Sequence, residues 1–428
     1  MDLLIRAARL FDSTSPAHGE PMDIWIENGL IRQLGQHLTV PDGTRVVEAA
    51  NLCVSPGWVD MRVTAQDPGY EHKEDLTSVC QTAAAGGFTD IVLLPNTLPV
   101  VDAKGPLGYL QRMSTGQPVR VHAMAAITRK AEGIDFTDMI DLHHAGAVAF
   151  SDGTHPLQHP DLLLKTLQYL NPIGGLLINR PEETSLNLYG QMHEGVQSTL
   201  LGLKGMPSLA EEIRVERDLR LLEYVLGGSG ESDRPLLHFA TLSTARSVEL
   251  IRQAKAQGLP VSCDVAVHQL VFDDSAMAGF DTNLKVNPPF RSPDDRQALW
   301  AGLADGTIDA IVSDHSPQDA ESKNLEFDQA EFGMIGLETV FAAAITHNQA
   351  LPLATLIDRL TAGPRHILRL PPVRIAEGEP ACLTLFDPTA SWTYTHTRSK
   401  SKNSPFLGQT LTGRVIGTVA QGQYIPTV

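Results

Sequence analysis

The chain has 428 residues, a mass of 46.4 kDa and a formal charge of −17, with 42% hydrophobic and 19% charged residues. This composition allows a substantial core and excludes a largely disordered chain. The negative charge disfavours sequence-independent binding of nucleic acid, which needs clustered Lys and Arg.

Charged residues interrupt the only short apolar stretch near the N-terminus, at Asp2, Arg6 and Arg9. No run of about 18 apolar residues occurs elsewhere, so we expect neither a signal peptide nor a membrane span, and by default a cytoplasmic protein. The cysteines have no paired spacing and are expected to be buried free thiols. They are Cys53, Cys80, Cys263 and Cys382.

The two ends of the chain share a pattern of short β-strands. Residues 1–54 and 370–428 alternate apolar and polar side chains between turn signals such as Glu27-Asn-Gly29 and Ala420-Gln-Gly422. Because chain termini often lie close together, we predict that these segments form one discontinuous β-sandwich domain.

Between them, over residues 55–369, strand-like apolar runs alternate with helix-like stretches, which is typical of βα units around a parallel sheet. The runs cover residues 57–63, 90–95, 119–126, 147–151, 175–179, 235–240, 260–265 and 310–313. Eight such strands close a (β/α)8 barrel, so we predict a TIM barrel here.

Two of the intervening helices carry clear end signals. Ser208 with Glu211 suggests a capping box, and Gly227-Gly228 ends the helix that follows. Its predicted buried face consists of Val215, Leu219, Leu222 and Leu226. A second helix is predicted after Ser243, ending near Gly258.

In such a barrel the chemistry lies at the carboxyl ends of the strands, where side chains from several strands surround one mouth. The residues predicted there are Arg62, Thr64, Asn96, Thr128, Asp152, Arg180, Thr241, His268 and Asp314.

Several stretches along nearly the whole chain resemble the type I dihydroorotases of the amidohydrolase superfamily. They include Ser55-Pro-Gly-Trp-Val-Asp60, Ala83-Ala-Ala-Gly-Gly-Phe-Thr89, Pro95-Asn-Thr-Leu-Pro99, Lys285-Val-Asn-Pro-Pro-Phe-Arg291 and Ser313-Asp-His-Ser-Pro317. The resemblance implies an amidohydrolase-type barrel with a small β domain. It also implies a zinc-dependent reaction that closes carbamoyl-aspartate to dihydroorotate.

In that family, a His-x-His pair and two further histidines hold zinc together with aspartates. Here Arg62 and Thr64 stand at the His-x-His positions, Arg180 and Thr241 at the other two, and Gln66 where the family has a substrate-binding Arg. The positions retained from the family are the aspartates Asp152 and Asp314 and the substrate-contacting asparagines Asn96 and Asn287.

These replacements predict that zinc is absent and that hydrolysis by the family mechanism is lost. Zinc needs lone-pair donors, whereas guanidinium has none and stays charged. The remaining histidines show no His-x-His or His-Glu-x-x-His spacing that would rebuild the site. We expect Arg62 or Arg180 to pair with Asp152 or Asp314 in place of the metal charge.

Three functions stay open. The resemblance favours a non-catalytic subunit, like the inactive dihydroorotase-like chains that assemble with aspartate carbamoyltransferase, as a homodimer or hetero-oligomer. The alternatives are an active dihydroorotase or related cyclic amidohydrolase with a remodelled site, and a module in which Arg62 and Arg180 bind an anionic metabolite.

Overall fold

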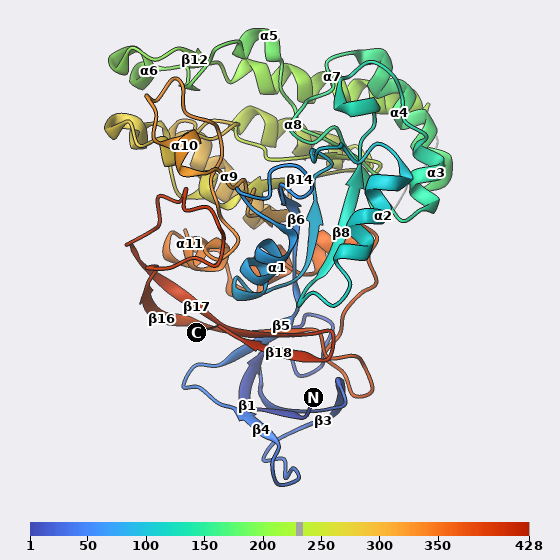
Figure 1. Ribbon diagram of the computed structural model, residues 1–428, viewed down its shortest axis with the longest axis vertical. Coiled ribbons are helices and arrows are strands. Elements are labelled where there is room, and N and C mark those ends of the chain that lie inside the picture. The colour runs from blue at the N-terminus through green and yellow to red at the C-terminus, as the bar shows by residue number, and fades with distance from the viewer. Residues whose placement is uncertain (228–233, 428) are drawn as a thin grey trace.

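A computed structural model describes residues 1–227 and 234–427. Its centre is a parallel sheet of eight strands in the order β15-β14-β13-β10-β9-β8-β7-β6 (Figure 1). The strands are β6 (Trp58–Val63), β7 (Phe88–Leu93), β8 (Arg120–Ala125), β9 (Ala149–Phe150), β10 (Leu177–Asn179), β13 (Leu237–Phe239), β14 (Val261–Ala266) and β15 (Ala310–Val312). Each falls on or within a residue or two of a predicted run, so the barrel prediction is confirmed.

The barrel closes where β6 meets the end of β15. The Thr64 amide donates to the His315 carbonyl at 2.9 Å, and the Ser313 amide donates to the Asp60 carboxylate at 3.0 Å. Burial raises the pKa of Asp60 to about 6. The barrel interior is filled with apolar side chains that include Val59, Met61, Val92, Met124, Ile178 and Val312.

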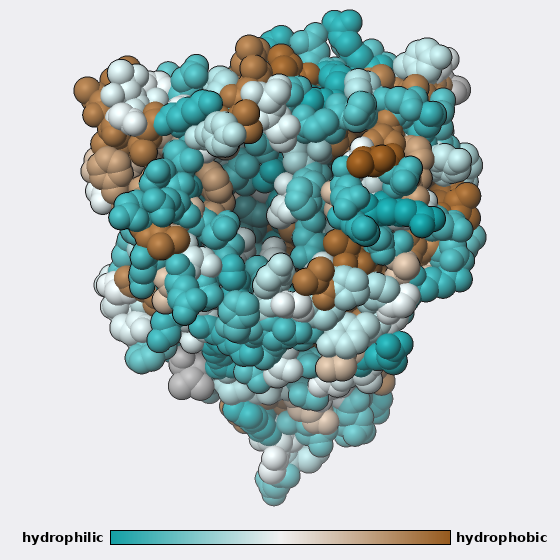
Figure 2. Space-filling view, turned by 45° about the horizontal axis from the view of Figure 1, so that its top comes forward, coloured by the Kyte–Doolittle hydropathy of each residue, from teal (hydrophilic) through white to brown (hydrophobic). Residues whose placement is uncertain are grey.

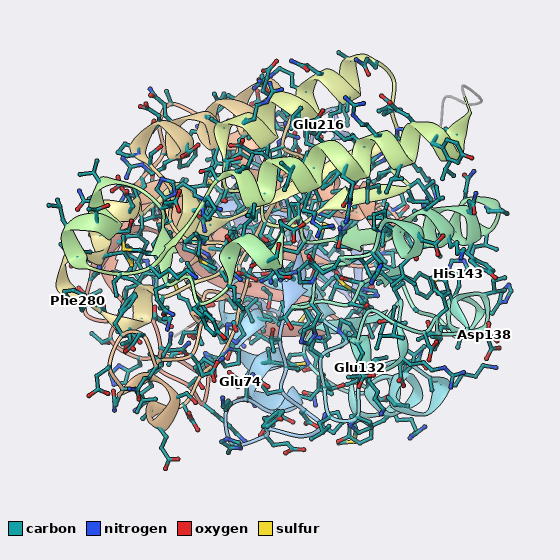
Figure 3. The ribbon with its side chains drawn as sticks, turned by 90° about the horizontal axis from the view of Figure 1, so that it is seen from above. Glu74, Glu132, Asp138, His143, Glu216 and Phe280 are labelled. Atoms are coloured by element: carbon teal, nitrogen blue, oxygen red, sulfur yellow. The ribbon has the colours of Figure 1, made fainter. Side chains whose placement is uncertain are left out.

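Helices surround this barrel (Figures 1 and 3). The longer ones are α1 (Leu76–Ala85), α2 (Lys104–Met113), α4 (Pro160–Ile173), α7 (Leu209–Leu226), α8 (Ala245–Ala256) and α9 (Pro293–Asp305). The shorter ones are α3 (Met139–His144), α5 (Thr184–Asn187), α6 (Val196–Leu201), α10 (Ala320–Lys323), α11 (Val340–Thr346), α12 (Leu353–Asp358) and α13 (Ala362–Ile367). Short 3₁₀ turns cover Arg129–Ala131, Val267–Leu270, Asp274–Gly279 and Thr282–Leu284.

Both predicted helices are present as α7 and α8. The capping box predicted for α7 is wrong, because Ser208 already has helical backbone angles and its side chain makes no cap hydrogen bond. Glu211 instead accepts hydrogen bonds from the Ser243 and Thr244 amides, which lie between β13 and the start of α8. Gly227 ends α7 in the left-handed conformation, whereas the predicted Gly228 lies outside the described residues.

The terminal segments form one hydrogen-bonded sheet below the barrel, in the order β18-β17-β16-β5-β1-β2-β3, with β4 paired to β1 (Figure 1). Its strands are β1 (Leu3–Leu10), β2 (Pro21–Glu27), β3 (Leu30–Gly35), β4 (Arg45–Val47), β5 (Cys53–Pro56), β16 (Leu383–Thr393), β17 (Thr410–Ala420) and β18 (Gln423–Pro426). Asn28-Gly29 and Gln421-Gly422 make the predicted tight turns, all four residues having positive φ. A two-stranded sheet of β11 (Met192–His193) and β12 (Gly205–Met206) lies near α5 and α6.

The predictions for the cysteines and for membrane-spanning segments can be compared with the structure. All four cysteines are free and buried, as expected. Among the described residues, no helix is both long and apolar enough to cross a bilayer.

Candidate functional site

A pocket of about 530 Å³ opens at the carboxyl ends of the barrel strands, and we call it the barrel mouth. Figure 2 shows a hollow bordered by hydrophilic residues on the face where the strands end. Most of the residues predicted from the sequence line it: Arg62, Thr64, Gln66, Asn96, Arg180, Asn287 and Asp314. These residues are far apart in the sequence, and the barrel brings them together because its parallel strands all end on the same face.

Arg62 and Asp314 form the central ion pair of the barrel mouth. The Arg62 Nε donates to Asp314 Oδ1 at 2.7 Å, and the two side chains are 4% and 15% exposed. Arg62 lies on β6, and Asp314 lies two residues after the end of β15, with a left-handed φ of 48°. The pairing expected between an arginine and an aspartate of the mouth is confirmed for this pair.

Arg180 has a different partner from the one expected. It directly follows β10 and donates to Glu182 Oε2 at 2.6 Å and to the Thr154 carbonyl at 2.9 Å. Asn287 donates to the same Glu182 carboxylate at 3.2 Å. Glu182 was missed in the sequence, although it stands only two residues after Arg180, because the aspartates were the only acids assigned to the mouth.

Asp152 is bound by the backbone and not by an arginine. Its carboxylate accepts from the amides of Ile127 and Thr128, at 2.8 and 2.9 Å, and from the Thr128 hydroxyl at 2.6 Å. Burial raises the pKa of Asp152 despite these donors. Asn96 fixes the same loop by donating to the Asp152 carbonyl at 3.1 Å and accepting from the Thr154 amide. The expectation that an arginine takes the place of the metal charge beside Asp152 is therefore wrong for this aspartate.

The remaining family positions contribute only neutral groups. Thr64 lines the mouth, whereas Thr241 lies below it beside a void of about 10 Å³ next to Arg180. The Thr241 hydroxyl is buried and has no hydrogen-bond partner among the described residues. Gln66 reaches the Pro317 carbonyl only at 3.4 Å.

Comparison with known proteins identifies the family. A family model described as dihydro-orotase-like matches residues 51–229. Proteins named dihydroorotase from Geobacter metallireducens and Pelotomaculum thermopropionicum are 40% and 39% identical, each match covering 99% of this chain and 99% and 98% of the relative. The chain belongs to the dihydroorotase family.

Solved structures agree on the fold of this dihydroorotase-family chain. An L-hydantoinase from Arthrobacter aurescens superposes with a TM-score of 0.84 at 23% identity, over 99% of this chain and 95% of that one. A D-hydantoinase from Thermus sp. gives a TM-score of 0.81 at 20% identity. At this identity the likeness establishes the amidohydrolase-type barrel alone.

The donor set of this barrel mouth does not fit zinc, the metal implied by the family. Arginine has no lone pair to donate, and isolated threonine hydroxyls are poor ligands. No group of three or more His, Cys, Asp or Glu side chains within residues 1–227 and 234–427 is arranged to hold a metal ion. No catalytic step through zinc can therefore be built from these residues.

Histidines near the mouth do not replace the missing ligands. His155 lines the pocket and lies 3.4 Å from Asn96 Nδ2. His268 is fully buried, and neither of its ring nitrogens forms a hydrogen bond within the part of the chain that the structure describes. Burial lowers the pKa of His268 to about 4. His315 is also buried, 3.5 Å from Glu74 and outside the pocket lining. Within the described ranges, none of these histidines belongs to a group of three or more His, Cys, Asp or Glu side chains that could hold a metal ion.

Proposed function

We propose that this dihydroorotase-family chain carries out no zinc-dependent hydrolysis and serves as an assembly subunit for aspartate carbamoyltransferase. The observation that carries the first part is the Arg62–Asp314 ion pair at 2.7 Å. A guanidinium directed at the aspartate that lines the pocket fills the role of a cation there, and it would repel a divalent metal.

The second part rests on what the chain retains. The full barrel and the terminal sheet are preserved, while the residues needed for family chemistry are replaced. A role carried by the outer surface accounts for this combination, because assembly depends on buried surface anchors and not on the old pocket. The choice of aspartate carbamoyltransferase as the partner rests on the resemblance to inactive dihydroorotase-like chains.

An active dihydroorotase is the second candidate, and the names of the relatives favour it. Relatives about 40% identical over nearly the whole chain are named dihydroorotase. The mouth also retains a pocket of about 530 Å³ with Asn96 and Asn287 in its lining. Such an enzyme would need a way to activate water without the usual metal ligands.

Anion capture in the mouth has less support. Both arginines are already matched by carboxylates, Arg62 by Asp314 and Arg180 by Glu182. An anionic ligand would have to displace these acids or share their partners. The pocket therefore has little uncompensated positive charge.

Metal content and activity distinguish the first two candidates. We expect the protein purified from zinc-supplemented cells to hold well under one equivalent of zinc, to gain no thermal stability from added zinc, and to show no dihydroorotase activity in either direction. The Geobacter metallireducens relative, assayed in parallel, is the control. Stoichiometric zinc together with turnover would establish the active enzyme instead.

Co-expression with the aspartate carbamoyltransferase of the same organism tests the partner. We expect the two proteins to elute together in size-exclusion chromatography, and the complex to survive Asp314→Ala and Arg180→Ala in variants shown to be folded. If the proteins never associate, the assembly role is wrong. If the mouth variants alter transferase activity while the complex stays intact, the mouth acts as a sensor and the surface-only role is wrong.

A further inference from the structure

A second cavity lies at the amino ends of the barrel strands, on the side opposite the mouth, and we call it the lower cavity. Its volume is about 260 Å³. Helix α13 and the segment that follows it form one wall, and Ile367 and Leu368 from this region close the base of the barrel interior. Phe11 and Asp12, after strand β1, line the other side.

Cations dominate the polar lining of the lower cavity. They are Arg234, Arg365, Arg369 and Arg374, together with His366. Such a cluster is unusual in a chain with a formal charge of −17. Burial and the nearby charge of Arg234 both lower the pKa of Arg369, so two guanidiniums lie close together here.

Two acids, Asp12 and Asp358, also line the lower cavity, and a third, Asp90, pairs with one of its arginines. Asp90 pairs with Arg365 at 2.6 Å and thereby neutralises that one cation. Asp12 accepts from the Thr14 amide and hydroxyl and from the Ile375 amide, at 2.7–2.9 Å. Asp358 accepts from the Ser13 hydroxyl at 3.4 Å, and burial raises its pKa.

Two further arginines of the cluster are Arg369, which is partly buried, and Arg374, which is exposed. Neither forms an ion pair with any residue in the described ranges. Arg369 Nη2 donates to the Pro235 carbonyl at 3.1 Å, which fixes the guanidinium in place, while its Nε is buried without a partner. A buried, unpartnered N–H of a charged group is costly unless an acceptor arrives.

We propose that the lower cavity binds a small phosphate monoester, with Arg369 and Arg374 holding the phosphate. The planar guanidinium fork matches phosphate oxygens in a bidentate arrangement. Phe11, Leu370 and Val373 supply an apolar wall against which the organic part of the ligand packs. This site is separate from the barrel mouth and does not depend on the function proposed for it.

Calorimetric titration of the full-length protein tests this site, with inorganic phosphate, adenosine monophosphate and adenosine as the probes. We expect one site for both phosphate compounds and no binding of adenosine. Arg369→Gln combined with Arg374→Gln should weaken binding about tenfold or more, since hydrogen bonds to charged groups are lost. Circular dichroism and a thermal melt establish that the variant is folded.

Two matched variants distinguish binding in the lower cavity from binding elsewhere on the protein. Arg112→Gln removes an exposed arginine of α2 and should leave binding unchanged. Arg62→Met in the barrel mouth should also leave it unchanged when titrated at a temperature where a thermal melt shows that this variant is folded. Loss of binding in Arg62→Met, with retention in the Arg369→Gln, Arg374→Gln variant, would place the anion in the mouth and overturn the proposal. Equal binding of adenosine, or no saturable binding by the wild-type protein, would overturn it as well.

Discussion

Replacing Trp58 by alanine is expected to lower the free energy of unfolding by about 3–5 kcal/mol, the usual cost of deleting a large buried aromatic side chain. The indole is fully buried at the junction of the barrel and the terminal sheet. Its ring centroid lies 6.1 Å from Phe88 of β7, 5.1 Å from Phe341 of α11 and 5.6 Å from Phe386 of β16. Urea unfolding followed by circular dichroism measures the change.

Trp58 also forms a buried hydrogen bond, which adds to the expected loss of stability. Its N–H donates to the Ser55 hydroxyl at 2.9 Å, so truncation also leaves a buried hydroxyl without this donor. The exposed aromatic Tyr224 serves as the control, and Tyr224→Ala should change stability by roughly 0.5 kcal/mol or less. A loss below about 1 kcal/mol for Trp58→Ala would mean that the junction contributes little to the fold.

The barrel could be predicted from the sequence because each strand is a short apolar run that begins and ends at clear signals. The strand ends also predict the mouth, since parallel strands bring their carboxyl ends to one edge. Seven predicted residues accordingly line one pocket, although Arg62 and Asp314 are 252 positions apart. The turns at Asn28-Gly29 and Gln421-Gly422 followed from local chemistry alone.

Side-chain partners could not be predicted in the same way. The sequence indicates that Arg180 and Asp152 follow neighbouring strands, but not that Glu182 captures the guanidinium or that backbone amides satisfy Asp152. Glu211 is another example, because its carboxylate binds the Ser243 amide, which is distant in sequence, and does not form the capping box predicted from the local sequence. Such choices depend on which donor lies nearest in three dimensions.

The lower cavity was missed for a related reason. Its lining combines Phe11 and Asp12 with Arg369 and Arg374, which are more than 350 positions away in sequence. These arginines stand in a short stretch after α13 with no motif around them, and neighbouring prolines suggest only a loop. Their common orientation toward one cavity becomes visible only when the barrel and terminal sheet are in place.

Removing Arg62 should destabilise the protein by about 3 kcal/mol or more, because it leaves a largely buried carboxylate without its cation. In Arg62→Met the apolar stem is kept while the 2.7 Å contact with Asp314 is lost. The Asp314→Asn, Arg62→Met double variant should recover most of this loss, since a neutral amide replaces the unpaired charge. Urea unfolding of both single variants and the double variant gives the coupling free energy.

The surface pair Arg220–Glu216 is the matched control for this cycle. It joins residues four apart on α7 at 3.0 Å, with side chains 75% and 51% exposed, and Glu216 lies on the outer ring of helices (Figure 3). Arg220→Met should cost only about 0.5 kcal/mol. A similarly small effect for Arg62→Met would show that water already screens Asp314. The arginine would then not act as the cation that stabilises this acid, and the proposal that the Arg62–Asp314 pair takes the place of a metal would fail.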